Sequence, residues 1–502
     1  MLMQERLAGM NAEELRDLAS SLLSELSIKQ LKIDQLTHEM AVLKRWKFAA
    51  RSEQLQGEQK HLFEEAVEAD LEAIGLELKA LQRQEAKTPP KETPKRAPLP
   101  SNLPRVEIRH EPESTTCGCG CQLKRIGEDI SEKLNFTPGV FTVERHIRGK
   151  WACAKCQTLT QAPVPAHVID KGIPTTGLLA QVLVAKYHDH QPLYRQEGIF
   201  QRAGVAIPRS TLAQWVGACG MQLQPLVDAM RQALLQSAVL HADETPVAML
   251  APGKGKTHRA YLWAYGTTQY ESLRVVVYDF AEGRSGTHAR EFLEGWRGKL
   301  VCADYAGYKA LFAEGVTEIG CLAHARRKFH DLWANHKSPL AEEALTLFGA
   351  LYEVEELARE LDADDRQRLR QLRSKPVADT LHAWLILQRQ RATDGTAIAK
   401  AIDYSLGRWQ ALVRFLDDGN LPIDNNWLEN RIRPIALGRA NWLFAGSLRA
   451  GKRAAAVMSL IQSAKLNGLD PYRYLKDVLE RLPTQPNSRI EELLPHRWQP
   501  SG

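Results

Sequence analysis

The segment from about residue 235 to 332 constrains the fold more than any other part of the chain, because strand-like and helix-like patterns follow one another there in a fixed order. Three apolar runs joined by turn-rich segments come first: SAVLHADETPVAML, HRAYLWAYGT and SLRVVVYDFAEGR. A helical stretch follows, then KLVCADYAGY, an amphipathic segment and VTEIGCLAHARRKF. Short apolar runs bounded by turn residues are typical of strands. The predicted order is therefore β-β-β-α-β-α-β.

This order is that of a ribonuclease H-like fold, in which the first and fourth strands lie side by side at the centre of the sheet. Asp243 closes the first run and Asp304 the fourth, so these two carboxylates are predicted to be neighbours. Asp279 ends the third run, which lies at the sheet edge, and Glu244 points to the opposite face of its strand. One aspartate at a strand end is commonly a turn or capping residue. Two on adjoining central strands favour a functional site.

A third acidic residue, Glu429, lies in the segment IDNNWLENRIRP. Asp424 or Asn425 can cap a helix whose second turn carries Glu429, and Pro434 then ends or kinks that helix. Three converging carboxylates can hold two divalent cations, and two cations can drive in-line attack at a phosphodiester. Mg²⁺, or Mn²⁺ in its place, suits such oxygen ligands. The three acids are therefore predicted to be catalytic ligands of two metal ions.

Five of the eight cysteines fall within a short segment, which favours metal over disulfides in a chain expected to be cytoplasmic. Cys153 and Cys156 have the spacing of one zinc knuckle, and CGCGC offers Cys117, Cys119 and Cys121 for the other. Two of these three complete a structural zinc site: Cys117 with Cys121, or Cys119 with one neighbour. Unrelated free thiols are the alternative. The segment between the clusters alternates like two strands joined by a Pro-Gly turn.

The N-terminal region divides into a helical segment and a linker. Residues 1–85 are poor in Pro and Gly, and a 3-4 spacing of apolar residues favours a coiled coil that self-associates. The residues with this spacing are Leu26, Ile33, Leu36, Met40 and Leu43. A helical hairpin packed on itself is equally compatible with the pattern. Residues 86–105 hold six prolines, so they form an extended linker before the zinc-binding β domain of residues 106–165.

Residues 170–232 have a helical pattern with one internal turn. One helix ends near Gly204 and another begins at Pro208, and two short helices joined by a Gly-containing turn fit a helix-turn-helix. The leading turn of the recognition helix would then carry four predicted DNA contacts: Arg209, Ser210, Thr211 and Gln214. An ordinary helical hairpin is the alternative.

Residues 333–420 carry no strand signal and are predicted to be a helical insertion between the two parts of the core, 233–332 and 421–465; a tail, 466–502, follows. Basic residues interleaved with aromatic ones surround the third acid and suit contacts to phosphates and bases. The predicted DNA contacts near the acids are Arg326, Arg327, Arg431, Arg433 and Arg439. For Arg326 and Arg327 a solvated helix face is the alternative.

Length and charge agree with several domains and a polyanionic partner. A chain of 502 residues exceeds one ordinary core. A net charge of +6 favours binding to nucleic acid but does not establish it. No run of eighteen apolar residues occurs, so no membrane contact is expected, and MLMQERLAGMNAEELRD lacks the apolar segment of a secretion signal.

Several motifs resemble a known family. HADETP, ADYAGY, CLAHARR and DNNWLENRIRPIALGRANWLFAGS are similar to the catalytic core of the insertion-sequence-66 family of bacterial DDE transposases. GEDISEKLNFTPGVFTVERHIRGKWACAKC resembles its zinc-binding region, and the helical segment that includes KFAARSEQL resembles its leucine-zipper-like region. The first zinc knuckle of the family usually has two cysteines separated by two residues, and CGCGC departs from that spacing.

The resemblance implies that Asp243, Asp304 and Glu429 are the catalytic triad. It implies a transposase that cuts double-stranded DNA at the terminal inverted repeats of a mobile element and joins the freed 3′-OH to target DNA. Two small accessory proteins are implied as partners, and bringing two DNA ends together predicts a homodimer or higher oligomer. Two other functions compete: a Mg²⁺-dependent nuclease that cuts without joining, and a zinc-containing DNA-binding regulator whose acids are structural.

Overall fold

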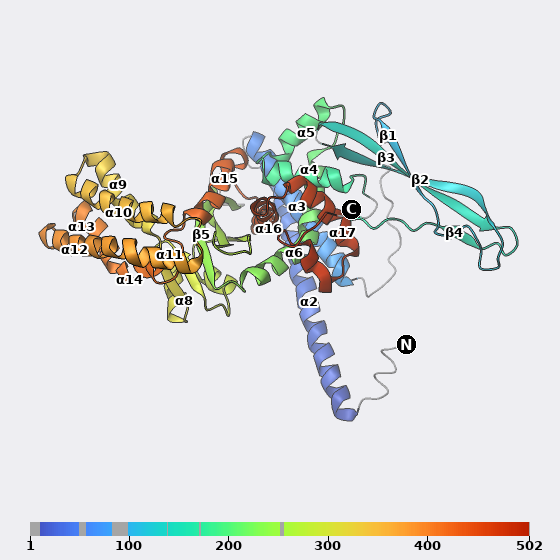
Figure 1. Ribbon diagram of the computed structural model, residues 1–502. Coiled ribbons are helices and arrows are strands. Elements are labelled where there is room, and N and C mark those ends of the chain that lie inside the picture. Colours follow the sequence, from blue (N-terminus) through green and yellow to red (C-terminus); the bar gives the residue numbers. More distant parts are fainter. Residues whose placement is uncertain are drawn as a thin grey trace. The chain divides into compact units, whose positions relative to one another are not determined.

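The computed structural model describes residues 11–49, 57–82, 99–137, 139–169, 172–251 and 256–500 (Figure 1). Most of the predicted linker and Pro138 of the predicted Pro-Gly turn lie outside these residues. Two compact units are present. The first comprises Met1–Val182, Pro192–Gln222 and Pro252–Gly255, and the second comprises Leu183–Gln191, Leu223–Ala251 and Lys256–Gly502.

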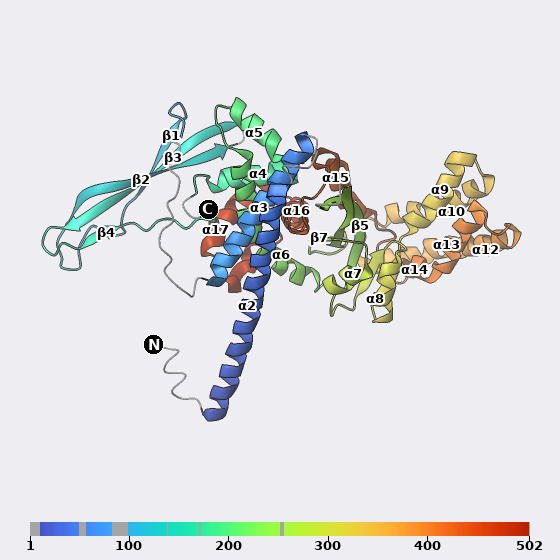
Figure 2. The same cartoon turned by 180° about the vertical axis from the view of Figure 1, so that it is seen from behind.

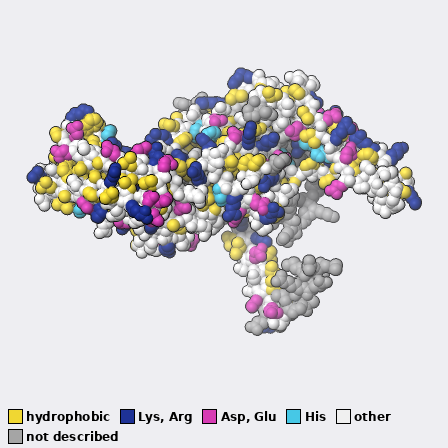
Figure 3. All heavy atoms as spheres, in the orientation of Figure 1, with side chains coloured by type: hydrophobic (Ala, Val, Ile, Leu, Met, Phe, Trp, Pro, Cys, Tyr) yellow, Lys and Arg dark blue, Asp and Glu magenta, His cyan; other side chains and the backbone are white. Residues whose placement is uncertain are grey.

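The first unit begins with two helices, α2 (Ala12–Ala49) and α3 (Gly57–Gln82), which lie side by side in both ribbon views (Figure 1 and Figure 2). They pack against each other, with Leu36 and Ile74 buried, so the hairpin arrangement is present. In contrast, Leu26, in the N-terminal half of α2, is 61% exposed. Figure 3 shows apolar side chains at the surface of this half of the helix. Self-association through that half stays a prediction.

A four-stranded sheet follows in the first unit, formed by β1 (Arg105–His110), β2 (Leu123–Thr137), β3 (Val140–Cys153) and β4 (Leu159–Gln161). The central strand β3 pairs in parallel with β1 and antiparallel with β2 and β4. The alternating apolar residues predicted the long β2–β3 hairpin, whose inner positions, such as Leu134 and Val143, are fully buried. The register pairs Leu123 with Cys153, so the chain that leads into β2 reaches the second cysteine cluster at the far end of this hairpin.

Three helices complete this part of the chain: α4 (Thr176–Tyr187), α5 (Leu193–Arg202) and α6 (Arg209–Leu234). The turn between α5 and α6 contains Gly204, whose φ of +84° is a left-handed value that glycine adopts without strain. The predicted helix-turn-helix boundaries are therefore present. However, α6 has 26 residues, so the expectation of two short helices is wrong for the second.

The second unit contains a five-stranded sheet in the order β7-β6-β5-β8-β9. The strands are β5 (Val239–Ala251), β6 (Lys256–Thr267), β7 (Val276–Ala281), β8 (Lys299–Cys302) and β9 (Thr317–Gly320), with α7 (Gly286–Phe292) before β8 and α8 (Lys309–Ala313) before β9. The first three strands are antiparallel, while β8 is parallel to β5 and to β9. The predicted pairing of the first and fourth strands is thus observed.

The edge strand β7 is covered by α16 (Leu448–Leu466). Ser459 and Ser463 of α16 accept hydrogen bonds from the backbone N–H groups of Tyr278 and Val276, at 2.8 Å and 3.0 Å. These hydroxyls satisfy donors that an open edge would present to solvent or to another strand. The predicted tail is also folded, since α17 (Pro471–Arg481) packs on α16 and Tyr474 is fully buried.

Helices extend from the end of the sheet that carries β9 (Figure 1). They are α9 (Leu322–His336), α10 (Pro339–Leu357), α11 (Ala363–Leu369), α12 (Lys375–Arg391), α13 (Ala397–Gly407) and α14 (Trp409–Val413). Their core includes Phe329, Phe348 and Phe415 and is continuous with buried residues of β8 and β9. Helical structure therefore begins directly after β9, about one helix earlier than the predicted boundary at 333. None of the described helices is long and apolar enough to cross a bilayer.

Candidate active site

Asp243 and Asp304 lie just past the segment in which the central strands β5 and β8 pair in parallel. The parallel register of β5 and β8 ends with His241 opposite Val301. Asp243 follows two residues after His241, and Asp304 two residues after the end of β8. The carboxyl ends of parallel strands meet at one edge of a sheet, which is where α/β proteins commonly place ligands. Asp304 follows the end of its strand, as the sequence predicted. The prediction that Asp243 ends its strand is wrong, because β5 continues past it to Ala251 in its antiparallel pairing with β6.

The carboxyl group of Asp243 is held in an unfavourable electrostatic environment. Burial, together with the negative charges of Glu244 and Glu429, raises its pKa to about 7. The backbone N–H of Glu244, which donates to Asp243 Oδ1 at 2.9 Å, only partly offsets this effect. A carboxyl group whose ionised form is penalised by burial and by like charges gains most when a cation binds to it.

Glu429 is carried by α15 (Asn426–Trp442), in its first turn rather than in the predicted second. Asp424 accepts hydrogen bonds from the Asn426 backbone N–H at 2.9 Å and from its side-chain amide at 2.7 Å, which stabilises the start of the helix. The helix continues through Pro434 to Trp442, so Pro434 does not end it, and of the two expected effects only a kink stays a prediction. Leu428 and Ile432 of the same helix are buried.

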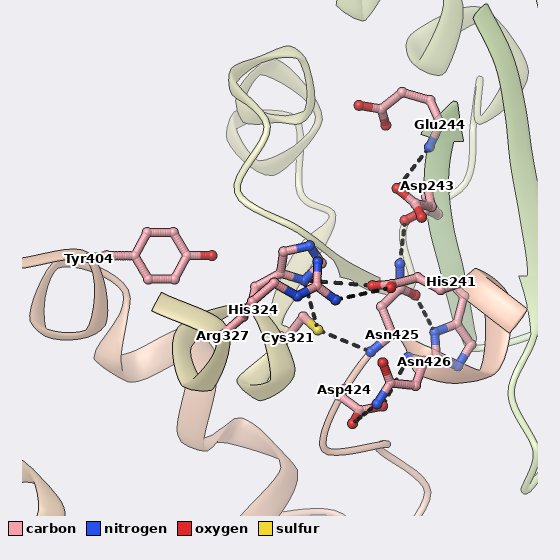
Figure 4. A network of polar contacts seen from close by, with 12 residues as sticks. His241, Asp243, Glu244, Cys321, His324, Arg327, Tyr404, Asp424, Asn425 and Asn426 are labelled. Carbon is pink, nitrogen blue, oxygen red and sulfur yellow. Dashed lines mark hydrogen bonds and ion pairs between the residues drawn. The ribbon is translucent and has the colours of Figure 1, made fainter. Parts of the chain in front are cut away.

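Asn425 ties the start of α15 to the strand that carries Asp243 (Figure 4). Its side-chain oxygen accepts a hydrogen bond from His241 Nδ1 at 2.7 Å, and its amide donates to the Ala242 carbonyl at 3.1 Å. Its backbone N–H donates to Cys321 Sγ at 3.2 Å. Asn425 is fully buried, and burial lowers the pKa of His241 to about 4, so the imidazole is neutral. One asparagine thus fixes three segments around the acids.

The side chain of Glu429 points toward two residues of α9, His324 and Arg327. Its Oε1 lies 3.7 Å from His324 Nδ1, and its Oε2 lies 3.6 Å from a guanidinium nitrogen of Arg327. His324 Nδ1 in turn lies 3.1 Å from Cys321 Sγ. The sequence had singled out Arg327 for phosphate contact, and in the structure it faces a carboxylate instead.

Asp304 lies apart from this network. Its carboxylate is 44% exposed and 3.9 Å from the guanidinium of Arg408, which also pairs with Glu318. Among the described residues, Asp243, Asp304 and Glu429 do not bring their oxygens within 4.8 Å of one another as a set of three. The structure therefore places Asp243 and Glu429 in one electrostatic environment and leaves Asp304 beside a cation.

Glu244 and Asp279, the two acids that the sequence analysis set apart from the site, have different surroundings. Glu244 accepts hydrogen bonds from Arg284 at 2.8 Å and 2.6 Å and from the Tyr308 hydroxyl at 3.1 Å. Asp279 lies on the edge strand β7, where its Oδ1 accepts from the Phe280 backbone N–H at 2.8 Å and burial raises its pKa. Neither residue contributes to the network around Asn425.

Four cysteines converge at the far end of the β2–β3 hairpin. The Sγ atoms of Cys117, Cys119, Cys153 and Cys156 all lie within 4.8 Å of one another. Cys119 is 3.7 Å from Cys153 and 3.8 Å from Cys156. A tetrahedral ZnS₄ centre with bonds of about 2.3 Å has sulfur–sulfur edges of about 3.8 Å. The cluster therefore supports a structural zinc ion, and Cys121 is the residue of the CGCGC segment that is not in it.

The predicted recognition turn makes contacts within the first unit. Arg209 pairs with Glu64 of α3 at 2.9 Å, and Gln214 donates to Glu68 at 3.1 Å. Ser210 is exposed and Thr211 is half-buried. The acidic face of α3 thus occupies two of the four side chains that were predicted to contact DNA, and DNA contact by this turn stays a prediction.

The predicted basic residues of α15 differ in their surroundings. Arg433 is exposed, while the Arg431 guanidinium lies 4.0 Å from the centre of the Trp427 ring. Arg439 donates to the Pro246 carbonyl at 2.5 Å and, with Arg259 and His258, lines a cleft of about 600 Å³. Lys and Arg are mixed with Asp and Glu over the surface in Figure 3. Arg326, on α9, is half-buried.

Comparison with known proteins gives matches along most of the chain. The profile described as "Transposase IS66 family" matches residues 171–453, and "IS66 C-terminal element" matches 459–496. Residues 114–157 match "zinc-finger binding domain of transposase IS66", and residues 35–108 match "Transposase C of IS166 homeodomain".

Curated relatives from Sinorhizobium fredii match over most of their length. "Uncharacterized protein y4jD" is 39% identical over 80% of this chain and 81% of the relative. "Uncharacterized protein y4qI" is 38% identical over 94% of this chain and 90% of the relative, and "Uncharacterized protein y4hP" is 32% identical over 94% and 88%.

Proposed function

We propose, because this chain belongs to the IS66 transposase family, that it cuts DNA at the terminal inverted repeats of a mobile element and joins the freed ends to target DNA. Asp243, Asp304 and Glu429 are the proposed ligands of a catalytic metal pair. The observation that carries this proposal is the environment of Asp243: a place on the central strand β5 just past its pairing with β8, a pKa raised to about 7, and Glu429 close enough to raise it.

The strand order β7-β6-β5-β8-β9 supports the inference of a ribonuclease H-like core. In that interpretation residues 233–332 and 421–465 form one core, and the helices between them are an insertion. Residues 1–85, 106–165 and 170–232 are then appended regions that bind DNA or a second copy of the chain, with zinc supporting the middle one. Accessory proteins and a homodimer remain part of the proposal.

The donor set suits Mg²⁺, which prefers carboxylate oxygens and retains water ligands. A bound pair of such ions would supply an activated water nucleophile and stabilise the leaving oxygen of an in-line displacement. The chain's own contribution is to hold the ligands: Asn425 fixes the start of the Glu429 helix against β5, next to Asp243. For Asp304 to join the set, its carboxylate has to exchange Arg408 for the metal pair.

Basic residues around the acids fit a role in placing DNA. Arg327 lies beside Glu429 with its side chain 55% exposed, and Arg433 is exposed on the same helix as Glu429. Exposed guanidinium groups contact phosphates without reading sequence. They are proposed to position the DNA backbone over the strand ends.

The direct test is to change each acid to its amide and to measure cleavage of element-end DNA in Mg²⁺. Asp243→Asn, Asp304→Asn and Glu429→Gln each remove one metal ligand with little change of shape, and each is expected to lower the cleavage rate about a thousandfold or more. DNA binding by these variants should persist.

Asp279→Asn is the matched control, because Asp279 is a second buried carboxyl of the same sheet whose pKa burial also raises. It should cut DNA at close to the rate of the unchanged chain. Normal cleavage by any one of the three variants would remove that residue from the site. Cut ends without joined products would favour a nuclease, and DNA binding without any cutting would favour a regulator.

A further inference from the structure

A second group of metal-ligand side chains lies beside the proposed catalytic acids. One ligand atom each from Cys321, His324 and Glu429 lies within 4.8 Å of the other two. His324 Nδ1 is 3.1 Å from Cys321 Sγ and 3.7 Å from Glu429 Oε1. The sequence had shown only the Cys-Leu-Ala-His spacing, and two ligands do not make a metal site. In the structure, Glu429 supplies the third ligand.

Three elements fix this geometry. Cys321 is the residue between β9 and α9, and His324 is three residues further, in the first turn of α9 on the same side. Glu429 comes from the first turn of α15, more than a hundred residues later. Asn425 joins the two helix starts, because its backbone N–H donates to Cys321 Sγ at 3.2 Å. An N–H donor to sulfur stabilises a thiolate that ligates a metal.

One ligand atom of the group lacks a hydrogen bond. Glu429 Oε1 is buried and has no hydrogen-bond partner within the part of the chain that the structure describes, although His324 Nδ1 lies 3.7 Å away. A buried carboxylate oxygen without a partner is costly. The position between Oε1, Nδ1 and Sγ is where a cation would satisfy all three atoms.

The ligand types select the metal. A thiolate, an imidazole and a carboxylate are ligands that Zn²⁺ accepts together, at distances of about 2.0–2.3 Å, whereas Mg²⁺ takes oxygen. Three protein ligands also leave one coordination position open, as in zinc sites that exchange a ligand. This distinguishes the group from the four-sulfur cluster of the first unit, which is filled by its own cysteines.

We propose that Cys321, His324 and Glu429 bind a second Zn²⁺ ion, and that this ion withdraws Glu429 from the Mg²⁺ pair and inhibits DNA cleavage. Binding displaces the Cys321 thiol proton to solvent and forms bonds from zinc to Sγ, Nδ1 and a Glu429 oxygen. Zinc binding stands on the geometry alone. The inhibition rests on the proposed function, because it requires Glu429 to be a ligand in both states.

The first experiment counts zinc in the full chain by elemental mass spectrometry after dialysis against a low zinc concentration. The unchanged chain should hold two ions, one for each cysteine-containing group, and Cys321→Ala should hold one. Cys302→Ala is the matched control, since Cys302 is equally buried and belongs to neither group, and it should retain two. His324→Gln, at a half-buried position, should also hold one and checks that the loss does not come from misfolding.

A single ion in the unchanged chain, or two in both Cys321→Ala and His324→Gln, would overturn the zinc site. Cobalt substitution gives a separate readout, because cobalt in the mixed site should show weaker sulfur charge-transfer absorption than cobalt bound by four thiolates. Cobalt spectra of the unchanged chain and of Cys321→Ala that do not differ would also contradict the proposal.

The second experiment titrates Zn²⁺ into Mg²⁺-driven cleavage, with each variant normalised to its own rate without added zinc. Zinc should inhibit the unchanged chain, and Cys321→Ala should need about tenfold more zinc or above for the same inhibition. Equal sensitivity would overturn the inhibitory role. If no chain cleaves DNA, the proposed function fails, while the zinc count still decides whether the site exists.

Discussion

The two cysteine-containing groups of this chain differ in how their ligands are assembled. The four-sulfur cluster takes Cys117 and Cys119 from one turn and Cys153 and Cys156 from another, at the end of one hairpin. The group around Glu429 takes its ligands from two helix starts that are separated by a helical insertion. Four like ligands close a site and hold it, whereas a mixed, three-ligand group beside buried carboxylates leaves room for exchange. The two groups thus differ in ligand chemistry as well as in place.

The largest effect is expected at the four-sulfur cluster. Cys119→Ser should abolish zinc binding by the hairpin and expose its cysteine-bearing end to protease, because this segment offers little apolar core to replace the metal. Cys121→Ser is the matched control and should keep the ion, since Cys121 is outside the cluster. The measurement is zinc content together with the positions of proteolytic cuts. Zinc loss in Cys121→Ser and not in Cys119→Ser would reverse the ligand assignment.

An intermediate effect is expected at the group around Glu429, where Asn425 holds the start of α15 against β5 and Cys321. Asn425→Ala removes the hydrogen bonds that the Asn425 side chain makes with His241 Nδ1 and with the Ala242 carbonyl. It leaves these buried polar groups unsatisfied. The free energy of unfolding should fall by about 2–4 kcal/mol, as measured by denaturant titration, and DNA cleavage should fall with it. The neighbouring Asn426→Ala, at an exposed position, should cost less than Asn425→Ala. Equal losses for the two variants would show that Asn425 has no special positioning role.

The smallest expected effect is a pH dependence of stability. The pKa of Asp243 is raised from 3.8 to about 7 in the folded chain, so folding favours the protonated carboxyl. Its contribution to stability is complete below about pH 4 and is lost as the pH rises through about 7. Without divalent cations, Asp243→Asn should therefore raise the melting temperature above pH 7 by about 2–4 °C and leave it unchanged near pH 4.

Added Mg²⁺ sharpens that measurement. It should stabilise the unchanged chain more at pH 8 than at pH 5, because the ionised carboxylate is the ligand. The same addition should have little effect on Asp243→Asn. A melting temperature of the unchanged chain that responds equally to Mg²⁺ at both pH values would count against Asp243 as a metal ligand.

The order of the strands along the chain could be predicted from the sequence because it depends on local patterns. Apolar runs give the strands, and chain order gives the pairing of β5 with β8. The arrangement around Glu429 could not be predicted, since it depends on how α15 and α9 meet across the insertion. Asn425 read as a helix cap, and nothing local indicated that its side chain would bond to β5 instead.

The choice of zinc ligands within residues 117–121 could not be predicted from the sequence either. The spacing indicated zinc but left three cysteines for two positions, because the choice depends on the backbone turn at residues 117–121. There Cys117 N–H donates to the Cys121 carbonyl at 2.8 Å, and the turn brings the sulfurs of Cys117 and Cys119 together with those of the second cluster. Likewise, α6 extends well past the short helix that the sequence pattern predicted, and apolar residues are buried over its whole length, from Leu212 to Leu234.

The most direct measurement is a structure of the full chain bound to element-end DNA in Ca²⁺, which occupies oxygen sites and commonly does not support the reaction. The account predicts cations about 2.4 Å from carboxylate oxygens of Asp243, Asp304 and Glu429, with Asp304 released from Arg408 and Glu429 turned away from His324. Cations elsewhere, with Asp304 still paired to Arg408 while DNA lies over the strand ends, would contradict the proposed three-carboxylate site.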